Sequence, residues 1–259
     1  MKIVTCYKWV LDDADIRVNE STRELDLEKS KAQINDYDQI GLEVGVQLKA
    51  ATGADLVGIS CGVNCAVSSK DALARGMDAV YTLDHSDLAG ADSAATSKTL
   101  AAMIKHLDTV DIVICSEGSS DEYAQQVGPR IAALLGFNCI TYASRVQMQG
   151  DVLKVERKLD DGVEVIEVNT PVVISIAPDI GEAPIPGVKQ ILGAKKKPST
   201  ALTLEDIGIS ADTLKPQLVV SSVKAPVVSR KAQRMNPEGV DISVAASDLV
   251  KQLRVDGVL

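Results

Sequence analysis

The chain has 259 residues, 46% of them hydrophobic, and a formal net charge of −9 at pH 7. This length and apolar content predict a folded protein built as one large domain, or as one domain with an extension. The acidic balance opposes binding to the phosphates of nucleic acids, and no apolar run approaches the roughly 20 residues that cross a bilayer. We therefore expect neither a nucleic-acid partner nor membrane insertion.

The cysteines and the first residues of the chain indicate the cellular compartment. Residues 3–10 form a strand-like run with no signal-peptide pattern before it, so we expect a cytoplasmic protein. The five cysteines mostly sit in or beside apolar runs and lack the second Cys/His pair of a zinc site. They are predicted to be buried free thiols in a reducing compartment.

The first half of the chain alternates strand-like and helix-like segments. Strands are expected at residues 3–10, 55–60, 79–83 and 110–115, and helical spacing covers 68–75, 95–107 and 127–134. Residues 40–48 alternate like a strand but also fit a helical stripe. We predict a helix there, because Asn35 or Asp36 can cap it and parallel strands need long crossovers. The order predicts a doubly wound, mostly parallel α/β sheet of the Rossmann-like, nucleotide-binding kind.

The second half changes character. Two alternating strands around Gly150 and the favoured turn Asp161-Gly162 predict an antiparallel excursion, after which residues 172–176 return to the sheet. A short helix is expected at 187–194. We divide the chain into an α/β domain, residues 1–198, and a C-terminal arm, residues 199–259. Apolar spacing is sparse in the arm until residues 242–253, so it is expected to contact another subunit, and from about residue 210 to wrap it rather than pack on this domain.

The loop after the fourth strand is the best ligand-binding candidate. Ligands of parallel sheets bind beyond the carboxyl ends of the strands, and a Gly/Ser-rich turn entering a helix offers N–H groups to an anion. Residues 116–128 fit this description. However, Glu117, Asp121 and Glu122 would repel phosphate unless they cap the helix or face sugar hydroxyls. This loop alone therefore allows two interpretations, a nucleotide-binding loop or an ordinary loop that caps a helix.

Several segments together resemble a known family. They are residues 2–10, 35–38, 57–62, 72–78, the hairpin 155–166 with the strand 171–176, and 193–197. This order is similar to that of electron-transfer flavoprotein β-subunits, and residues 121–128 look most like the nitrogen-fixation-associated, or Fix-type, branch. Ordinary members often have Thr where this chain has Val127. The run Val127-Gly128-Pro129 is similar to the electron-bifurcating type.

The resemblance implies an electron-carrier subunit rather than an enzyme. Its partner would be an α-subunit that holds FAD, and its own pocket would hold AMP or a second FAD. Electrons would pass between flavins and a flavin-dependent dehydrogenase or quinone-reducing partner, with electron bifurcation as a further option. The residues carried over to the pocket are Cys6, Asn35, Asp36, Tyr37, Asp38, Cys61, Ser116, Asp121, Gln125, Gln126 and Val127. Those carried over to partner recognition are Ile185, Val188 and Lys189.

A different class of function stays open. The chain could be a stand-alone nucleotide-binding or nucleotide-hydrolysing α/β protein. No Ser/His/Asp grouping is visible in the sequence, and a monomer has little use for a long arm, so the electron-carrier reading is preferred.

Overall fold

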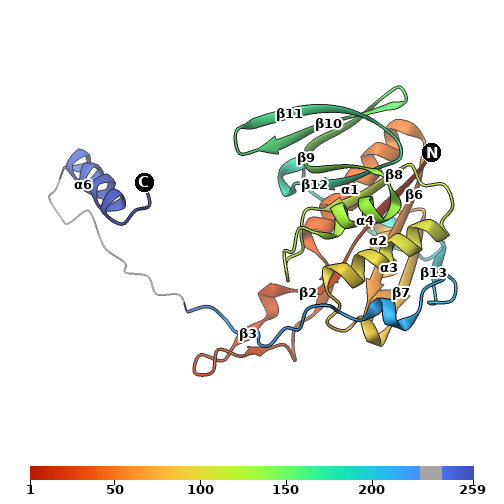
Figure 1. Cartoon of the computed structure of the whole chain (residues 1–259), viewed down its shortest axis with the longest axis horizontal. Helices are drawn as coiled ribbons and strands as arrows, with labels where there is room; N and C mark the ends of the chain where they lie inside the picture. Colours follow the sequence, from red (N-terminus) through yellow and green to blue (C-terminus); the bar gives the residue numbers. More distant parts are fainter. Residues whose placement is uncertain (228–240) are drawn as a thin grey trace.

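A nine-stranded sheet forms the centre of the computed structural model, which describes residues 1–227 and 241–259 (Figure 1). The strand order is β11-β10-β9-β12-β8-β1-β6-β7-β13. The bounds are β1 (Lys2–Cys6), β6 (Asp55–Gly62), β7 (Ala79–Asp84), β8 (Ile112–Ser116), β9 (Asn138–Gln149), β10 (Val152–Leu159), β11 (Gly162–Asn169), β12 (Val172–Ile176) and β13 (Ser199–Ala201). Only the pairings of β10 with β9 and β11 are antiparallel. The predicted mostly parallel sheet with an antiparallel excursion is confirmed.

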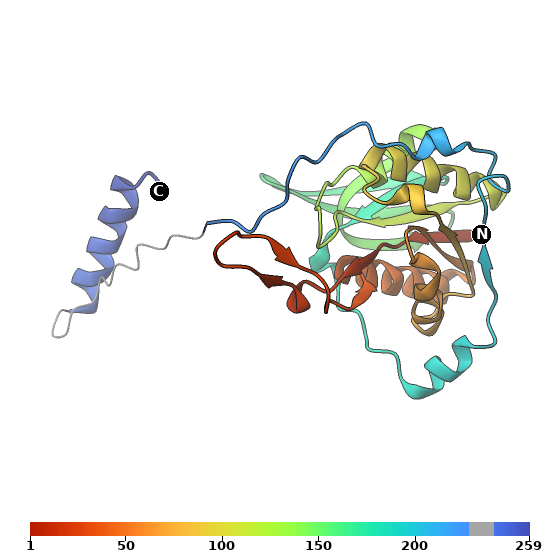
Figure 2. The same cartoon turned by 90° about the horizontal axis from the view of Figure 1, so that it is seen from below.

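Helices cover both faces of this sheet, as a doubly wound fold requires (Figure 2). The covering helices are α1 (Asp36–Thr52), α2 (Ser69–Ala74), α3 (Ser93–His106) and α4 (Val127–Leu135). Two further helices are not among them: α5 (Val188–Ala194) packs against α2, and α6 (Ile242–Val255) lies near the C-terminus. Successive strand residues point to opposite faces, so Ile3 packs under α1 and α2 while Val4 packs under α3 and α4. The helix predicted over residues 40–48 is confirmed as α1, and it ends at Gly53 in the left-handed conformation.

The predicted first strand, residues 3–10, is wrong in its extent. The strand β1 stops at Cys6, and β2 (Trp9–Leu11) pairs instead with β5 (Ala32–Ile34) in a separate ribbon. The cause lies at Lys8, whose N–H donates to the Asp38 carboxylate (2.7 Å) and whose carbonyl accepts from Asn35 N–H (3.0 Å). These bonds turn the backbone away from the sheet and toward the start of α1.

Short elements that the sequence did not predict decorate the sheet. A small ribbon pairs β3 (Arg17–Val18) with β4 (Leu25–Asp26) and projects from the domain in Figure 1. Single 3-10 turns are η1 (Asp13–Asp15), η2 (Cys65–Ser68), η3 (Ser86–Leu88), η4 (Pro178–Ile180) and η5 (Ala211–Leu214). Among the cysteines, Cys6, Cys65 and Cys115 are buried as expected, whereas Cys139 on β9 is exposed.

The C-terminal arm begins on the domain rather than away from it. The strand β13 extends the sheet edge beside β7, and Leu202, Ile207 and Leu214 are buried in the core under α3. The expectation that the arm leaves the domain from about residue 210 is therefore wrong for the first few residues. The boundary at residue 198 stays a prediction, and residues 228–240 lie outside the described residues. No helix in the described part of the chain is long and apolar enough to cross a membrane.

Candidate functional site

A pocket of about 420 Å³ opens at the carboxyl ends of β1, β6 and β8. This is the edge where parallel α/β sheets bind ligands. The structure brings to it, from four separate parts of the chain, most of the residues that the resemblance carried over. Those that line the pocket are Cys6, Asp38, Cys61, Ser116, Gln125, Gln126 and Val127. The other four residues do not line it, namely Asn35, Asp36, Tyr37 and Asp121.

Asp38 is a buried carboxyl group in the pocket wall, in the first turn of α1. Burial raises its pKa from the ordinary 3.8 to about 6, and the hydrogen bond from Lys8 N–H is among the contacts that partly offset this effect. A carboxyl group poised near pH 6 changes the charge of the pocket within the physiological range.

Asn35 holds the loop that follows β8. It is fully buried, its amide donates to the carbonyl of Gly118 (3.3 Å), and its side-chain oxygen accepts from Ser120 N–H (3.0 Å). It is the N-cap residue of α1 but makes no side-chain cap bond, because its amide is engaged by the loop. Asn35 therefore holds in place the loop after β8, whose residues Gly118 and Ser119 line the pocket.

Asp121 joins the same loop to Lys8. Its carboxylate lies 2.6 Å from the Lys8 ammonium and also accepts from the Ser119 hydroxyl at 2.6 Å. Partial burial opposes ionisation of Asp121, but the bonds from Lys8 and Ser119 outweigh it and hold its pKa below the ordinary value. The carboxylate stays charged at neutral pH and holds the ammonium of Lys8, which lines the pocket.

Asp36 and Tyr37 lie on the outer side of α1. Asp36 is exposed and accepts a hydrogen bond from Gln39 (3.1 Å). The Tyr37 ring packs against Tyr123 with the ring centroids 5.6 Å apart. Through Tyr123, Tyr37 contacts the loop that follows β8.

Three thiols meet where the strands end at the pocket, namely Cys6, Cys61 and Cys115. A hydrogen bond with Cys115 and burial raise the pKa of Cys6 well above its ordinary value, and burial raises that of Cys61 to about 12, partly offset by the charge of Lys8. Cys6 and Cys61 are therefore neutral thiols at physiological pH. They offer a weakly polar surface rather than nucleophiles.

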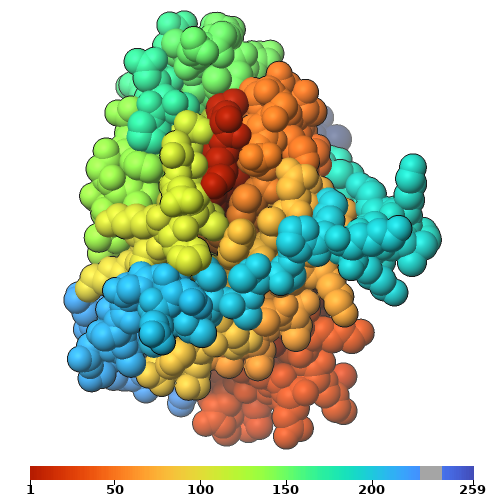
Figure 3. All heavy atoms as spheres, turned by 90° about the vertical axis from the view of Figure 1, so that its right-hand side faces the viewer, coloured from red at the N-terminus to blue at the C-terminus, as the bar shows by residue number. Residues whose placement is uncertain are grey.

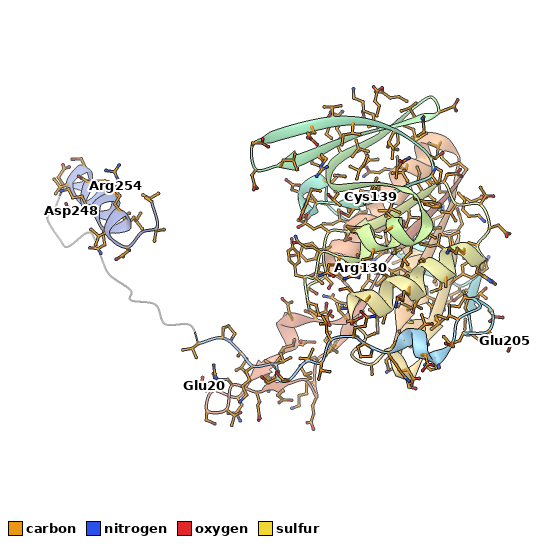
Figure 4. All side chains as sticks on the ribbon, in the orientation of Figure 1. Glu20, Arg130, Cys139, Glu205, Asp248 and Arg254 are labelled. Atoms are coloured by element: carbon orange, nitrogen blue, oxygen red, sulfur yellow. The ribbon has the colours of Figure 1, made fainter. Side chains whose placement is uncertain are left out.

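The start of α4 presents polar groups to the pocket. Gln126 is its N-cap residue, but its side-chain oxygen accepts from the Arg130 guanidinium (2.8 and 2.9 Å) instead of capping the first turn. Arg130 is labelled in Figure 4. The first-turn N–H groups of a helix that lacks a side-chain cap are natural donors to an anion.

Sequence reasoning missed two parts of this site. Lys8 lines the pocket, but the sequence placed it inside the predicted strand 3–10, where nothing marked it as a binding residue. A second wall comes from the start of α3, where Gly90, Ser93 and Thr96 line the cavity. The hydroxyls of Ser93 and Thr96 are three residues apart on one helix face, a spacing that could have indicated a polar wall.

The residues carried over to partner recognition lie on a separate projection. Ile185 and Val188 are 92% and 74% exposed, and Lys189 is exposed beside them. The segment with α5 stands out from the body of the protein, in cyan in Figure 3. Lys197 anchors its far end by donating to the carbonyls of Leu73 (3.1 Å) and Met77 (2.6 Å). Lys197 therefore ties the end of α5 to α2 and to the turn that follows it.

The comparison with known families agrees with this geometry. The family model of the electron transfer flavoprotein domain matches residues 25–207. The match covers α1 and every strand of the nine-stranded sheet except β1. It also covers the pocket residues at the end of β6, at the start of α3 and in the loop that enters α4. In the described part of the chain, no group of three or more His, Cys, Asp or Glu side chains could hold a metal ion.

Proposed function

The chain belongs to the electron transfer flavoprotein family, and on that premise we propose that it is the β-subunit of a heterodimeric electron-transfer flavoprotein of the Fix-type branch. Its α-subunit partner holds FAD, and the pair passes electrons between flavins and a dehydrogenase or quinone-reducing partner. The observation that carries the proposal is the convergence of Cys6, Asp38, Cys61, Ser116 and residues 125–127 on one pocket at the ligand-binding edge of the sheet.

The pocket is proposed to take an adenine nucleotide, either AMP or a second FAD. Its volume of about 420 Å³ lies within the range of small-molecule sites. The neutral thiols of Cys6 and Cys61, with the backbone groups beside them, suit the flat edge of an adenine ring. The N–H groups at the start of α4 and the hydroxyls of Ser93 and Thr96 suit phosphate oxygens.

Two features support FAD over AMP. Position 127 is a valine, which has no hydroxyl to donate to a single phosphate. The walls that start α3 and α4 both present polar groups, which suits the two phosphates of a dinucleotide better than the one of AMP. A second flavin held here supplies the redox chemistry for electron bifurcation, while the chain itself positions it and sets the charge around it.

The projection with α5 is proposed as the docking surface for the electron-exchange partner. Ile185 and Val188 offer exposed apolar anchors, and the prolines at 184 and 186 limit the entropy lost on docking. Lys189 and the lysines at 195 and 196 are exposed and favour an acidic partner surface.

The test is direct analysis of the bound nucleotides. The chain is co-purified with its partner, the nucleotides are released with acid, and they are separated by chromatography. One FAD with one AMP for each pair identifies an ordinary member, and two FAD identify the bifurcating type. A preparation that carries neither flavin nor adenine nucleotide contradicts the proposal.

A further inference from the structure

The charges around the pocket are unusual for a nucleotide site. Among the described residues that line it, Lys8 is the only cation, whereas Asp38, Glu117 and Glu122 bring carboxyl groups. A phosphate in this pocket meets more negative than positive side chains. Backbone N–H groups can offset part of that repulsion, and the remaining task falls to one ammonium group.

The backbone of Lys8 is fixed while its side chain reaches out. The N–H is bound by Asp38 at 2.7 Å and the carbonyl by Asn35 N–H at 3.0 Å, yet the side chain is 40% exposed. The charge of Lys8 is felt at Asp38, in the first turn of α1, and at Cys61, at the end of β6. The ammonium therefore acts on two walls of the pocket, and its ion pair with Asp121 joins it to the loop after β8.

The present partner of Lys8 is exchangeable. The ammonium lies 2.6 Å from Asp121 Oδ2, and the two side chains are 40% and 39% exposed. An ion pair this exposed contributes only about 0–1 kcal/mol, because water screens both charges. A phosphate group, with several oxygens and a higher charge, is a stronger partner for the same ammonium.

We propose that Lys8 is the phosphate-binding cation of this pocket and that Asp121 is the internal competitor from which a nucleotide phosphate takes it. The inference rests on the proposed function, since it requires that the pocket takes a nucleotide. It gives Asp121 the opposite role to the one carried over from the resemblance. Asp121 weakens nucleotide binding by occupying Lys8, instead of holding the nucleotide.

The chemistry of Asp121 allows a selective variant. Its Oδ1 accepts from the Ser119 hydroxyl (2.6 Å) and from Glu122 N–H (2.8 Å), while Oδ2 alone contacts Lys8. Asp121→Asn keeps an oxygen for the first two bonds and removes the charge that competes for Lys8. Lys8→Gln removes the cation, and Lys8→Arg keeps it and serves as the matched control.

The experiment measures the affinities of AMP and adenosine by calorimetry. It uses the full chain with its co-purified partner, after removal of bound nucleotide by extensive dialysis. Lys8→Gln should weaken AMP by about tenfold or more, as expected for a hydrogen bond between charged groups, and leave adenosine unchanged. Asp121→Asn should tighten AMP by up to about fivefold. Lys8→Arg should remain within about twofold of the wild type, and Asp121→Asn should give no gain in the Lys8→Gln background.

The proposal requires that Lys8→Gln weakens AMP binding and that Asp121→Asn strengthens it, which a purely structural role of the ion pair does not. If the ion pair only holds the loop in place, both Lys8→Gln and Asp121→Asn will weaken AMP, and adenosine will weaken with it. Weaker AMP binding by Asp121→Asn, or weaker adenosine binding by Lys8→Gln, overturns the assignment of Lys8. Neither result counts against a nucleotide in this pocket. If the wild type binds neither AMP, adenosine nor FAD, the proposed function itself fails.

Discussion

The buried carboxyl group of Asp38 should make the stability of the protein depend on pH. Its pKa is raised from the ordinary 3.8 to about 6, mainly by burial. Below pH 3.8 it is protonated in both the folded and the unfolded chain, so it contributes no penalty. Between these values the folded chain holds more protons than the unfolded chain, so the free energy of unfolding falls as the pH rises. Above pH 6 the full penalty, about 3 kcal/mol, is present.

The variant Asp38→Asn removes this penalty, because an amide stays neutral at every pH. At pH 7.5 the variant should be more stable than the wild type by about 2 kcal/mol. That figure is the 3 kcal/mol of the charge less about 1 kcal/mol for an altered hydrogen bond to Lys8 N–H. At pH 4 the two proteins should differ little, or the wild type should be slightly more stable.

The assay is urea denaturation of the purified complex at pH 4 to 7.5, followed by circular dichroism. Asp36→Asn is the matched control, because Asp36 is exposed two residues away on the same helix, and it should change stability by less than about 0.5 kcal/mol. The reasoning fails if the difference between the wild type and Asp38→Asn stays constant over this range, since a constant difference reflects packing and not ionisation.

Four further outcomes follow from the structure. The double variant Gln126→Glu with Val127→Glu should expel the nucleotide, and Val127→Glu should contribute more because Arg130 contacts residue 126. Leu134→Glu on the same helix is the control. Unchanged nucleotide content in the double variant would exclude this placement of the nucleotide. Gly45→Ala should lower the free energy of unfolding, measured by thermal denaturation, by about 1–3 kcal/mol, since its Cβ would lie 2.9 Å from Leu56 and from Thr5. The control Gly193→Ala meets nothing within 4 Å and should be neutral or slightly stabilising. Val188→Ala should slow electron transfer at subsaturating partner about fivefold, equivalent to about 1 kcal/mol, with unchanged flavin content. The control Val67→Ala, at a valine that is also exposed, should not slow it. A chain ending after residue 227 should keep its melting temperature and lose only the helical circular dichroism of α6, but it should no longer bind its α-subunit. A fully heterodimeric elution in gel filtration would rule this out.

The truncation point shows how the structure sharpened one expectation. Sparse apolar spacing predicted an arm from residue 199, but spacing does not show which few apolar residues reach the core. Leu202 and Leu214 do so, and Asp92 then accepts hydrogen bonds from the N–H groups of Gln217 (2.6 Å) and Leu218 (3.1 Å). A cut near residue 210 would therefore expose core as well as remove the arm, so its effect on assembly could not be interpreted.

Periodicity predicted what is local and repeated. The helix α1 follows from the stripe of Ile40, Val44 and Leu48, and the hairpin of β10 and β11 follows from Asp161-Gly162. The break after Cys6 could not be predicted in this way. It depends on a bond between Lys8 and Asp38, which are 30 residues apart in sequence, and no local pattern reports such a pair.

The site shows the same division between local and long-range information. The turn before α4 was recognisable because Gly and Ser cluster there, so Gln125, Gln126 and Val127 were named before the fold was known. Lys8 was not named, because its importance comes from the elements that fold around it. The acidic residues of the loop argued against a phosphate site in the sequence, and the structure shows that one of them, Asp121, is paired with Lys8.

The pairing changes how an acidic loop bears on anion binding. A carboxylate that faces an anion directly repels it, whereas we infer that a carboxylate paired with the one cation among the described lining residues acts through competition. The Asp38 carboxyl group accepts from the N–H of the same lysine, and its protonation near pH 6 removes a negative charge from the pocket wall. Under our proposal, the affinity for a nucleotide is set by two carboxyl groups that contact one lysine, and not by an excess of positive charge. A site built in this way can bind a nucleotide on a chain whose net charge is −9.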